Sequence, residues 1–365
     1  MAPSVAEVEQ PPQATSIETA KEAARGAAHY LVPHDESYTY SKYRPFQETF
    51  DKEPALRYFD HVDAGSRADP AKPHLLTSDT KLLHLSPYLG TEVRGVQLSK
   101  LSKDGLDELA LFVAERKVVV FRDQDLKDVT PEAQLAFTSH FGPPHVHPIA
   151  VNIEGFPALA VVYRDEERPG FQDHLVSTQI NHTNWHSDVS YEKQPPGTTF
   201  FYILDGPEVG GDTLFLSQVE AYRRLSPEFQ KRLLGLTAVH TAVPQAEGAT
   251  KRGLPIRRDP VESEHPIIRV HPVTGEKALF INPGFTSRIV GFKKEESDAL
   301  LGFLFDHITK GADFQVRLRY EPGSVVIWDN RVTAHSAIPD FDRKLRRHHI
   351  RLTPQAEKPI AAAEI

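Results

Sequence analysis

The sequence predicts a mostly β protein, a sandwich or jelly roll with helices packed on its outside. Three observations favour this class. Short apolar runs of strand length recur from residue 81 onward, Gly and Pro residues separate them, and only a few stretches have helical periodicity. Many short strands joined by such turns are typical of sandwiches and jelly rolls.

Composition divides the 365 residues into four segments. Residues 1–29 are rich in Pro, Ala, Glu and Ser, which predicts a disordered tail. Residues 30–80 mix aromatic and charged residues without periodicity, and we expect them to pack on the body as an N-terminal extension. We expect the body to span residues 81–356 and residues 357–365 to form a loose C-terminal end.

A few stretches of the body predict helices. Thr130 and Ser226 are N-cap residues, and each is followed by a proline at the first helical position. The stretch 293–308 has the clearest amphipathic pattern. The predicted helices are residues 101–116, 130–141, 226–236 and 293–308.

The strand candidates are short and rich in β-branched and aromatic residues. A Thr-Gly turn at 274–275 joins two of them, which predicts a β-hairpin. The predicted strands are residues 117–123, 158–163, 198–204, 212–216, 266–270, 277–281, 314–320, 324–328 and 347–353.

Composition also excludes several classes of function. The chain has no cysteine, which rules out disulfides, thiol catalysis, zinc–thiolate sites and iron–sulfur clusters. The formal net charge of −8 argues against a nucleic-acid partner. No apolar run approaches the roughly 18 residues of a membrane span, and the N-terminus has no secretory h-region. We expect a cytoplasmic protein without a membrane partner. The chain could form a homo-oligomer.

The stretch NWHSDVS, residues 184–190, places His186 and Asp188 two positions apart. On a strand both side chains would point to one face and could ligate one metal. The best third ligand is His335, which follows the predicted strand 324–328 and a polar turn in a hairpin-like unit. Two imidazoles and one carboxylate form the facial triad of non-haem Fe(II) oxygenases. The alternative is a surface pair without a metal.

The stretch RKLRRHHIRLT carries several arginines shortly after His335. A strand here would place Arg347, His349 and Arg351 on one face, with Arg346, His348 and Ile350 on the other. An inward arginine needs an anionic partner, because a buried unpaired charge is costly. A metal-chelating dicarboxylate such as 2-oxoglutarate would fit both features. The alternative is a solvated basic edge strand.

From about residue 81 to its C-terminus, the chain resembles the taurine dioxygenase (TauD/TfdA) family of Fe(II)/2-oxoglutarate-dependent dioxygenases. The motifs that carry the resemblance are LSPYLGTEVRGVQLS, VVVFRDQ, HFGPPHVHP, NWHSDVSYEKQPPG, GGDTLFLS, RVHPVTGEKALFINPGFTSRIVGF, FQVRLRYEPGSVVIWDNRVTAHSA and RHHIRLTP. Residues 1–80 resemble the N-terminal extension of fungal sulfonate dioxygenases of this family. The resemblance implies a double-stranded β-helix, a cupin-like jelly roll.

The resemblance also implies roles for individual residues. His186, Asp188 and His335 match the iron ligands. Thr213 and Arg347 match the residues that bind the distal carboxylate of 2-oxoglutarate. The spacing from His335 is one residue longer than in the bacterial taurine enzyme, so Arg346 is a rival for the role of Arg347.

In the substrate pocket, Arg351 and His147 match residues that hold a sulfonate. Val189 and Phe285 match apolar walls of that pocket. His182 stands where the bacterial taurine enzyme has an asparagine, which puts taurine itself in doubt.

The expected function is hydroxylation of the carbon next to sulfur in small sulfonates. The expected products are sulfite and an aldehyde, with succinate and CO2 from 2-oxoglutarate and O2. One alternative is a dioxygenase of the same family that acts on an alkyl sulfate, an aryloxy acid, a purine or a secondary metabolite. Another is an inactive jelly-roll binding protein.

Overall fold

The computed structural model describes residues 32, 34–46, 52–169, 171–181, 183–254 and 256–363. The expected disordered tail, residues 1–29, and the single residue His182 lie outside these ranges. Within them, no helix has both the length and the apolar character that a membrane crossing requires.

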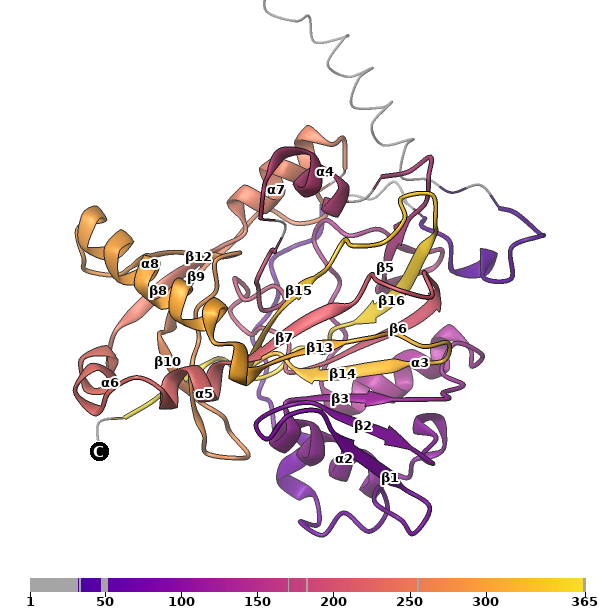
Figure 1. The fold of residues 1–365 in the computed structure, drawn as a ribbon, viewed down its shortest axis with the longest axis horizontal. Coiled ribbons are helices and arrows are strands. Elements are labelled where there is room, and N and C mark those ends of the chain that lie inside the picture. Colours follow the sequence, from indigo (N-terminus) through magenta and orange to yellow (C-terminus); the bar gives the residue numbers. More distant parts are fainter. Residues whose placement is uncertain are drawn as a thin grey trace, which may run out of the picture.

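An eight-stranded sheet forms the largest layer of the molecule (Figure 1). Neighbouring strands are antiparallel except for β2 and β3, which are parallel. In order across the sheet, the strands are β1 (Lys81–His84), β2 (Thr91–Arg94), β3 (Val118–Phe121), β14 (Val325–Asp329), β6 (Thr198–Asp205), β16 (Arg347–Leu352), β5 (Phe156–Arg164) and β4 (Asn152–Ile153).

Three smaller sheets complete the β structure of the described residues, each with three strands. The first consists of β13 (Gln315–Leu318), β7 (Thr213–Ser217) and β15 (Thr333–Ala337). The second consists of β12 (Thr286–Ile289), β8 (Thr237–Thr241) and β9 (Glu262–Pro266), and the third of β11 (Lys277–Leu279), β10 (Ile268–Val270) and β17 (Ile360–Ala361).

Helices cover the outside of these sheets. The α-helices are α2 (Lys103–Arg116), α3 (Pro131–Thr138), α4 (Phe171–Thr178), α5 (Gln218–Arg223), α6 (Pro227–Leu233), α7 (Val243–Lys251) and α8 (Lys294–Lys310). The short 3-10 helices are η1 (Ser41–Tyr43), η2 (Ala64–Arg67), η3 (Leu98–Lys100), η4 (Ser139–Phe141) and η5 (Ala312–Phe314). Both predicted N-caps are confirmed: Thr130 accepts a hydrogen bond from the N–H of Ala133, and Ser226 from that of Phe229.

Strand β6 shows how the large sheet separates two apolar cores. Phe200 and Tyr202 point to one face and pack in the core that includes apolar residues of α2. Phe201 points to the opposite face and packs with Phe215 of β7 and Trp328 of β14. The β13–β7–β15 sheet therefore faces the large sheet across a second core, and the pocket described below opens between these two sheets.

Every predicted helix and strand has a counterpart in the structure, with ends that differ by a few residues. The predicted hairpin is confirmed, because β10 and β11 pair antiparallel. The missed strands are β1, β2, β4, β8, β9, β12, β15 and β17, and the missed helices are α4, α5 and α7. Most missed strands are short or carry polar residues on both faces, as in Glu262–Pro266, so apolar alternation is weak in them.

The expected loose C-terminal end, 357–365, is wrong for residues 357–363. Strand β17 pairs with β10, and the N–H of Ala362 donates a hydrogen bond to the carbonyl of Ile268. Glu357 accepts from the guanidinium of Arg269 at 2.6 Å. Arg269 is almost fully buried and needs a carboxylate, which gives a physical reason for the order of this segment.

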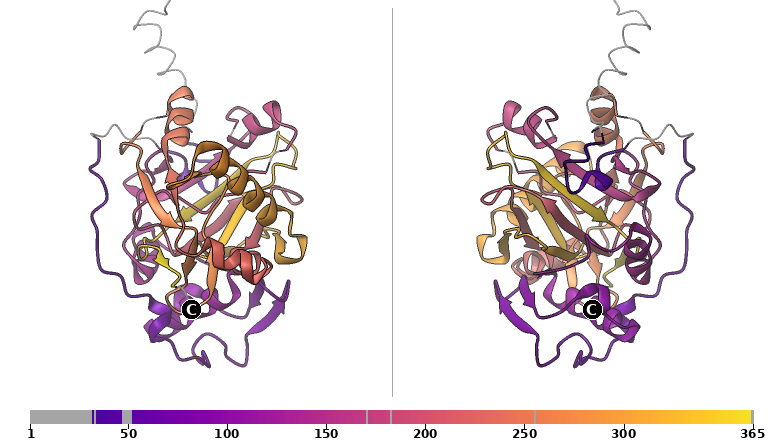
Figure 2. Two further views of the ribbon diagram at one scale, coloured as in Figure 1. Left: turned by 90° about the vertical axis from the view of Figure 1, so that its left-hand side faces the viewer. Right: turned by 90° about the vertical axis from the view of Figure 1, so that its right-hand side faces the viewer.

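The described part of the N-terminal extension runs along the outside of the body (Figure 2). Tyr43 is fully buried, and its hydroxyl donates to the carbonyl of Lys127 at 2.7 Å. At the far end of the segment, the Asp63 carboxylate pairs with the buried guanidinium of Arg331. These contacts fasten the segment at two distant points.

Replacing Asp63 by Asn should lower the free energy of unfolding by about 1–3 kcal/mol at neutral pH, because Arg331 loses a charged partner in a buried site. Burial alone would raise the pKa of Asp63, but Arg331 outweighs it and the pKa is lowered. The carboxylate therefore stabilises the fold above its unfolded pKa, and this contribution disappears as the pH falls through the folded pKa.

Urea denaturation between pH 3 and pH 7 would measure the difference in the free energy of unfolding between wild type and Asp63→Asn. This difference should become smaller toward acid pH. Asp60→Asn is the matched control, because Asp60 is exposed in the same segment and its loss should change stability by less than about 0.5 kcal/mol. Equal stability of Asp63→Asn and wild type at pH 7 would contradict this role of the ion pair.

Candidate active site

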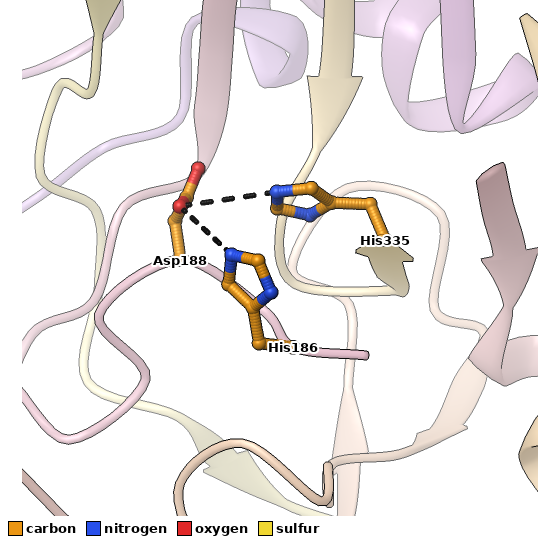
Figure 3. A group of neighbouring side chains, drawn as sticks. All are labelled: His186, Asp188 and His335. Atoms are coloured by element: carbon orange, nitrogen blue, oxygen red, sulfur yellow. Dashed lines mark ion pairs between the residues drawn. The ribbon is translucent and has the colours of Figure 1, made fainter. Parts of the chain in front are cut away.

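His186, Asp188 and His335 converge on one point (Figure 3). The Asp188 Oδ1 atom lies 3.7 Å from Nε2 of His186 and 3.9 Å from Nε2 of His335. One ligand atom from each residue lies within 4.8 Å of the other two. The backbones of His186 and His335 exchange both hydrogen bonds, at 3.0 and 2.8 Å, so residue 186 lies beside β15 in strand-like pairing.

Two local expectations about the triad are wrong, although its members meet. Asp188 does not continue a strand from His186: it begins a turn, and Val189 follows it at a φ of 38°. Strand β15 does not form a hairpin with β14 either, because β14 pairs with β3 and β6 while β15 pairs with β7. The polar turn 329–332 instead carries the chain from the large sheet to the small one.

Asn330 in that turn explains the turn at Asp188. Its Oδ1 accepts a hydrogen bond from the backbone N–H of Asp188 at 2.6 Å, and its Nδ2 donates to the carbonyl of Asp188 at 2.9 Å. The side chain is fully buried. A positive φ is unfavourable for a β-branched residue such as Val189, so this double contact helps to hold a conformation that the chain would otherwise avoid.

The donor atoms are in the form that a metal requires. The Nδ1–H of His186 donates to the carbonyl of Asn184 at 2.7 Å, which leaves the Nε2 lone pair directed toward Asp188. Burial lowers the pKa of both imidazoles, that of His335 to about 3, so both rings are neutral. Burial would raise the pKa of Asp188, but Arg351 and the neighbouring histidines together outweigh it, and the pKa is lowered.

Two neutral imidazoles and a carboxylate fit non-haem Fe(II). A further observation supports the fit: the Oδ2 atom of Asp188 is buried and has no hydrogen-bond partner among the described residues. A buried carboxylate oxygen without a partner is costly, and a bound cation would satisfy it.

A cavity of about 110 Å3 adjoins the triad and is lined by Thr213, Tyr320 and Arg347 among others. Arg347 is buried and donates to the carbonyl of Gly211, and no carboxylate of the described chain lies within ion-pair distance of it. The hydroxyls of Thr213 and Tyr320 share a hydrogen bond of 2.8 Å. Burial raises the pKa of Tyr320 to about 12, so its hydroxyl stays protonated. The pocket thus offers a cation and hydroxyl groups to an anion.

Arg346 lies on the opposite face of β16, as the predicted alternation requires. Its Nε donates to the hydroxyl of Tyr163 at 3.2 Å, and its guanidinium lies 3.9 Å from the ring centroid of Tyr38. It does not line the 110 Å3 cavity, whereas Arg347 and Arg351 both do. The other predicted inward residue, His349, stacks on Phe201 at 4.6 Å.

A larger cavity of about 450 Å3 lies on the other side of the triad, lined by His147, His186, Phe285 and Arg351 among others. The Nη1 atom of Arg351 is 2.6 Å from Oδ1 of Asp188, which places its guanidinium at the boundary between the two cavities.

The remaining predicted substrate residues are placed differently. Val189 does not line the larger cavity but packs in a small cluster behind Phe285. The Nδ1 of His147 accepts from the N–H groups of Ile149 and Ala150 at 3.2 and 3.1 Å, so its Nε2 carries the proton. Burial lowers the pKa of His147 well below its usual range, and the neutral ring can donate one hydrogen bond. His182 lies outside the described residues.

Sequence reasoning misses three residues of the site: Asn184, Tyr320 and Asn330. Asn184 precedes His186 by two positions, and its role rests on a backbone carbonyl, which no residue type reveals. Tyr320 ends a predicted strand whose inward face the sequence does not define. Asn330 belongs to the predicted polar turn, and its position directly after a strongly apolar strand is the signal that could have marked it as buried.

Replacing His335 by Ala should lower Fe(II) affinity by at least about 100-fold and abolish turnover, because one of three ligands is lost. Titration of both proteins with Fe(II) under anaerobic conditions would measure the change in affinity. His307→Ala is the control, because this histidine of α8 contacts the carbonyl of Ala221 away from both cavities. Unchanged Fe(II) binding by His335→Ala would show that a different residue is the ligand.

Comparison with known proteins agrees with this geometry. The family model for the taurine catabolism dioxygenase TauD, TfdA family matches residues 81–353. The α-ketoglutarate-dependent dioxygenase cnsP of Penicillium expansum is 48% identical over 333 residues, which cover 88% of each chain. An α-ketoglutarate-dependent sulfonate dioxygenase of Saccharomyces cerevisiae is 39% identical over 329 residues, or 89% of this chain and 80% of the yeast protein.

A solved structure extends the agreement to the fold. The crystal structure of a taurine dioxygenase from Burkholderia xenovorans superposes with a TM-score of 0.64 and 31% sequence identity, and covers 78% of this chain and 91% of that one. The family match spans the triad and both cavity-lining arginines, since all of them fall within residues 81–353. The chain therefore belongs to the TauD/TfdA family of Fe(II)- and 2-oxoglutarate-dependent dioxygenases.

Proposed function

We propose that this enzyme hydroxylates the carbon next to sulfur in an organosulfonate. One oxygen atom of O2 enters succinate, formed with CO2 from 2-oxoglutarate, and the other becomes the hydroxyl group of an α-hydroxysulfonate. The C–S bond then breaks, the hydroxyl proton leaves, and the products are an aldehyde and sulfite. Alkyl sulfates, aryloxy acids, purines and secondary metabolites remain the alternative substrates.

The observation that carries this proposal is the pair of arginines on β16. Arg347 and Arg351 point to the same side of the sheet, and both line the cavity next to the triad. Of the two, only Arg351 also lines the larger cavity. The centre therefore has one buried cation, Arg347, for the co-substrate and a second, partly buried cation, Arg351, which can bind an anionic substrate beside its contact with Asp188.

Arg347 and Thr213 would hold the distal carboxylate of 2-oxoglutarate. Arg347 can offer two parallel N–H donors to a carboxylate, and Thr213 can add a hydroxyl. His186, Asp188 and His335 would hold Fe(II), which supplies dioxygen activation and the oxidative decarboxylation of 2-oxoglutarate. The apolar wall of Phe215 and Trp328 keeps water away from this end of the site.

Arg351 and the Nε2–H of His147 would hold the sulfonate. The contact between Arg351 and Asp188 places that anion directly beside the triad, where the neighbouring carbon can react. The comparisons support this substrate class: the yeast relative is named a sulfonate dioxygenase. We also assign the facing sheets β13–β7–β15 and β3–β14–β6–β16–β5 to a double-stranded β-helix.

An inactive binding protein is disfavoured by the same residues. The three donor atoms lie within reach of one ion, and the inward arginine Arg347 lacks a carboxylate partner in the described structure. Both features are costly for folding and have a clear use in catalysis.

Replacing Arg347 by Gln should raise the KM for 2-oxoglutarate by about 10-fold to 100-fold, because a charge-assisted bidentate contact is lost. The steady-state rate of succinate formation at varied 2-oxoglutarate concentration would measure this KM. Arg346→Gln is the matched control and should change this KM by less than about twofold. A larger effect in Arg346→Gln would overturn the assignment of Arg347.

A substrate panel tests the reaction itself. Sulfonates should release sulfite in equal amounts with succinate, and matched alkyl sulfates, carboxylates and neutral analogues should release none. Succinate formation that is stimulated by a neutral or carboxylate compound, with no sulfite from any sulfonate, would move the enzyme to one of the alternative substrates.

A further inference from the structure

We propose, on the basis of the proposed function, that the sulfonate substrate carries an extended apolar body that fills the 450 Å3 cavity. The head group would bind Arg351 beside the triad, and an alkyl or aryl chain longer than that of taurine would run outward between β5 and α7. This inference replaces the short substrate that the sequence alone favoured.

The first argument is the difference in size between the two cavities. The co-substrate cavity has about 110 Å3, and the substrate cavity has about 450 Å3. Volumes of roughly 300–1,000 Å3 are typical of pockets that enclose ligands of drug size. A two-carbon sulfonate would leave most of this space to water against apolar walls, and displacing that water is favourable.

The second argument is the distribution of polar groups. Arg351 and His147, which can bind an anion, belong to the end of the cavity that adjoins the triad. The rest of the wall includes the apolar side chains of Val161 and Leu254, with Phe285 beside His186, and it also includes Arg252 at α7. An amphiphilic cavity of this kind fits a molecule with one anionic head and an apolar body.

Two further polar side chains of the wall, Tyr163 and Arg168, share one carboxylate partner. Arg168 and the hydroxyl of Tyr163 both contact the Oδ2 atom of Asp165, each at 2.8 Å. Arg168 is thus paired with a carboxylate within the protein, and this part of the wall does not need a second anion from the substrate.

The third argument is Gly248, in the middle of α7, which lines the cavity. Glycine destabilises a helix interior relative to alanine, so its presence needs a reason. A Cβ atom at this position would meet only the Nη1 atom of Arg252, at an ordinary 3.4 Å. A side chain would therefore fit at this position. Because glycine has none, the corresponding volume belongs to the cavity.

A chain-length series tests the proposal. With 2-oxoglutarate and linear alkanesulfonates from ethane- to decanesulfonate, kcat/KM for sulfite release should rise about threefold to fourfold per methylene until the cavity is full, the equivalent of about 0.8 kcal/mol per buried methylene. In Gly248→Leu, the ratio of kcat/KM for octanesulfonate to that for ethanesulfonate should fall at least about tenfold, because the leucine occupies the space of the chain.

Gly302→Leu is the matched control. Gly302 is an exposed glycine of α8, a Cβ atom at its position would have no neighbour within 4 Å, and this variant should keep the wild-type ratio. Gly248→Ala serves as the milder variant if Gly248→Leu folds poorly, and should lower the ratio in the same direction. Ethanesulfonate turned over as efficiently as octanesulfonate, or a wild-type ratio in both Gly248 variants, would overturn the proposal.

Alkyl sulfates and carboxylates of the same lengths separate this inference from the proposed function. Length-dependent succinate formation with these compounds, and no sulfite from any sulfonate, would refute the sulfonate reaction and support the apolar body. Sulfite release that is best with ethanesulfonate would support the reaction and refute the apolar body. Stimulation by no anion of any length would refute both.

Discussion

The buried side chain of Asn330 is the contact on which the geometry of the active site depends. It holds both backbone polar groups of Asp188 and so sets the position of the carboxylate relative to His186 and His335. Its own position follows from the turn between β14 and β15, where the chain passes from the large sheet to the small one. The side-chain amide of Asn330 thereby links the arrangement of the two sheets to the position of the triad.

The neighbours of Asn330 explain why distant parts of the chain converge behind the site. Arg331 is fully buried and binds Asp329 through two nitrogens, at 2.8 and 2.7 Å. Asp63 and Glu357 complete its surroundings, and both lie outside the residues that match the family model. A buried guanidinium is costly unless carboxylates surround it. The N-terminal extension and the segment before β17 therefore support the turn that positions Asp188.

The sequence predicts the parts of the site that depend on local periodicity. Alternation along β16 places Arg347 and Arg351 inward and Arg346 outward, as the structure confirms. The strand-like pairing of His186 and the turn at Asp188 were not predictable, because His186 pairs with the distant His335 and Asp188 depends on Asn330, 142 residues away. The same limit explains the false hairpin: local apolar runs identify β14, but they do not say with which sheet the next strand pairs.

The triad and most of the walls of the large cavity belong to different elements of the fold, and this affects which substrates can bind. The triad and the two inward arginines lie on β15, β16 and the segment around His186, and Asn330 connects the segment around His186 to the turn before β15. Apart from His186 and Arg351, the walls of the large cavity come mainly from β5, α7 and the segments around Ile149 and Phe285, which supply none of the three donor atoms. Side chains on these walls can therefore change the length and shape of the accepted substrate while the positions of the triad and of Arg347 are kept. Reaction type and substrate body are therefore largely separate properties of this fold, and they meet at His186 and Arg351, which line both cavities.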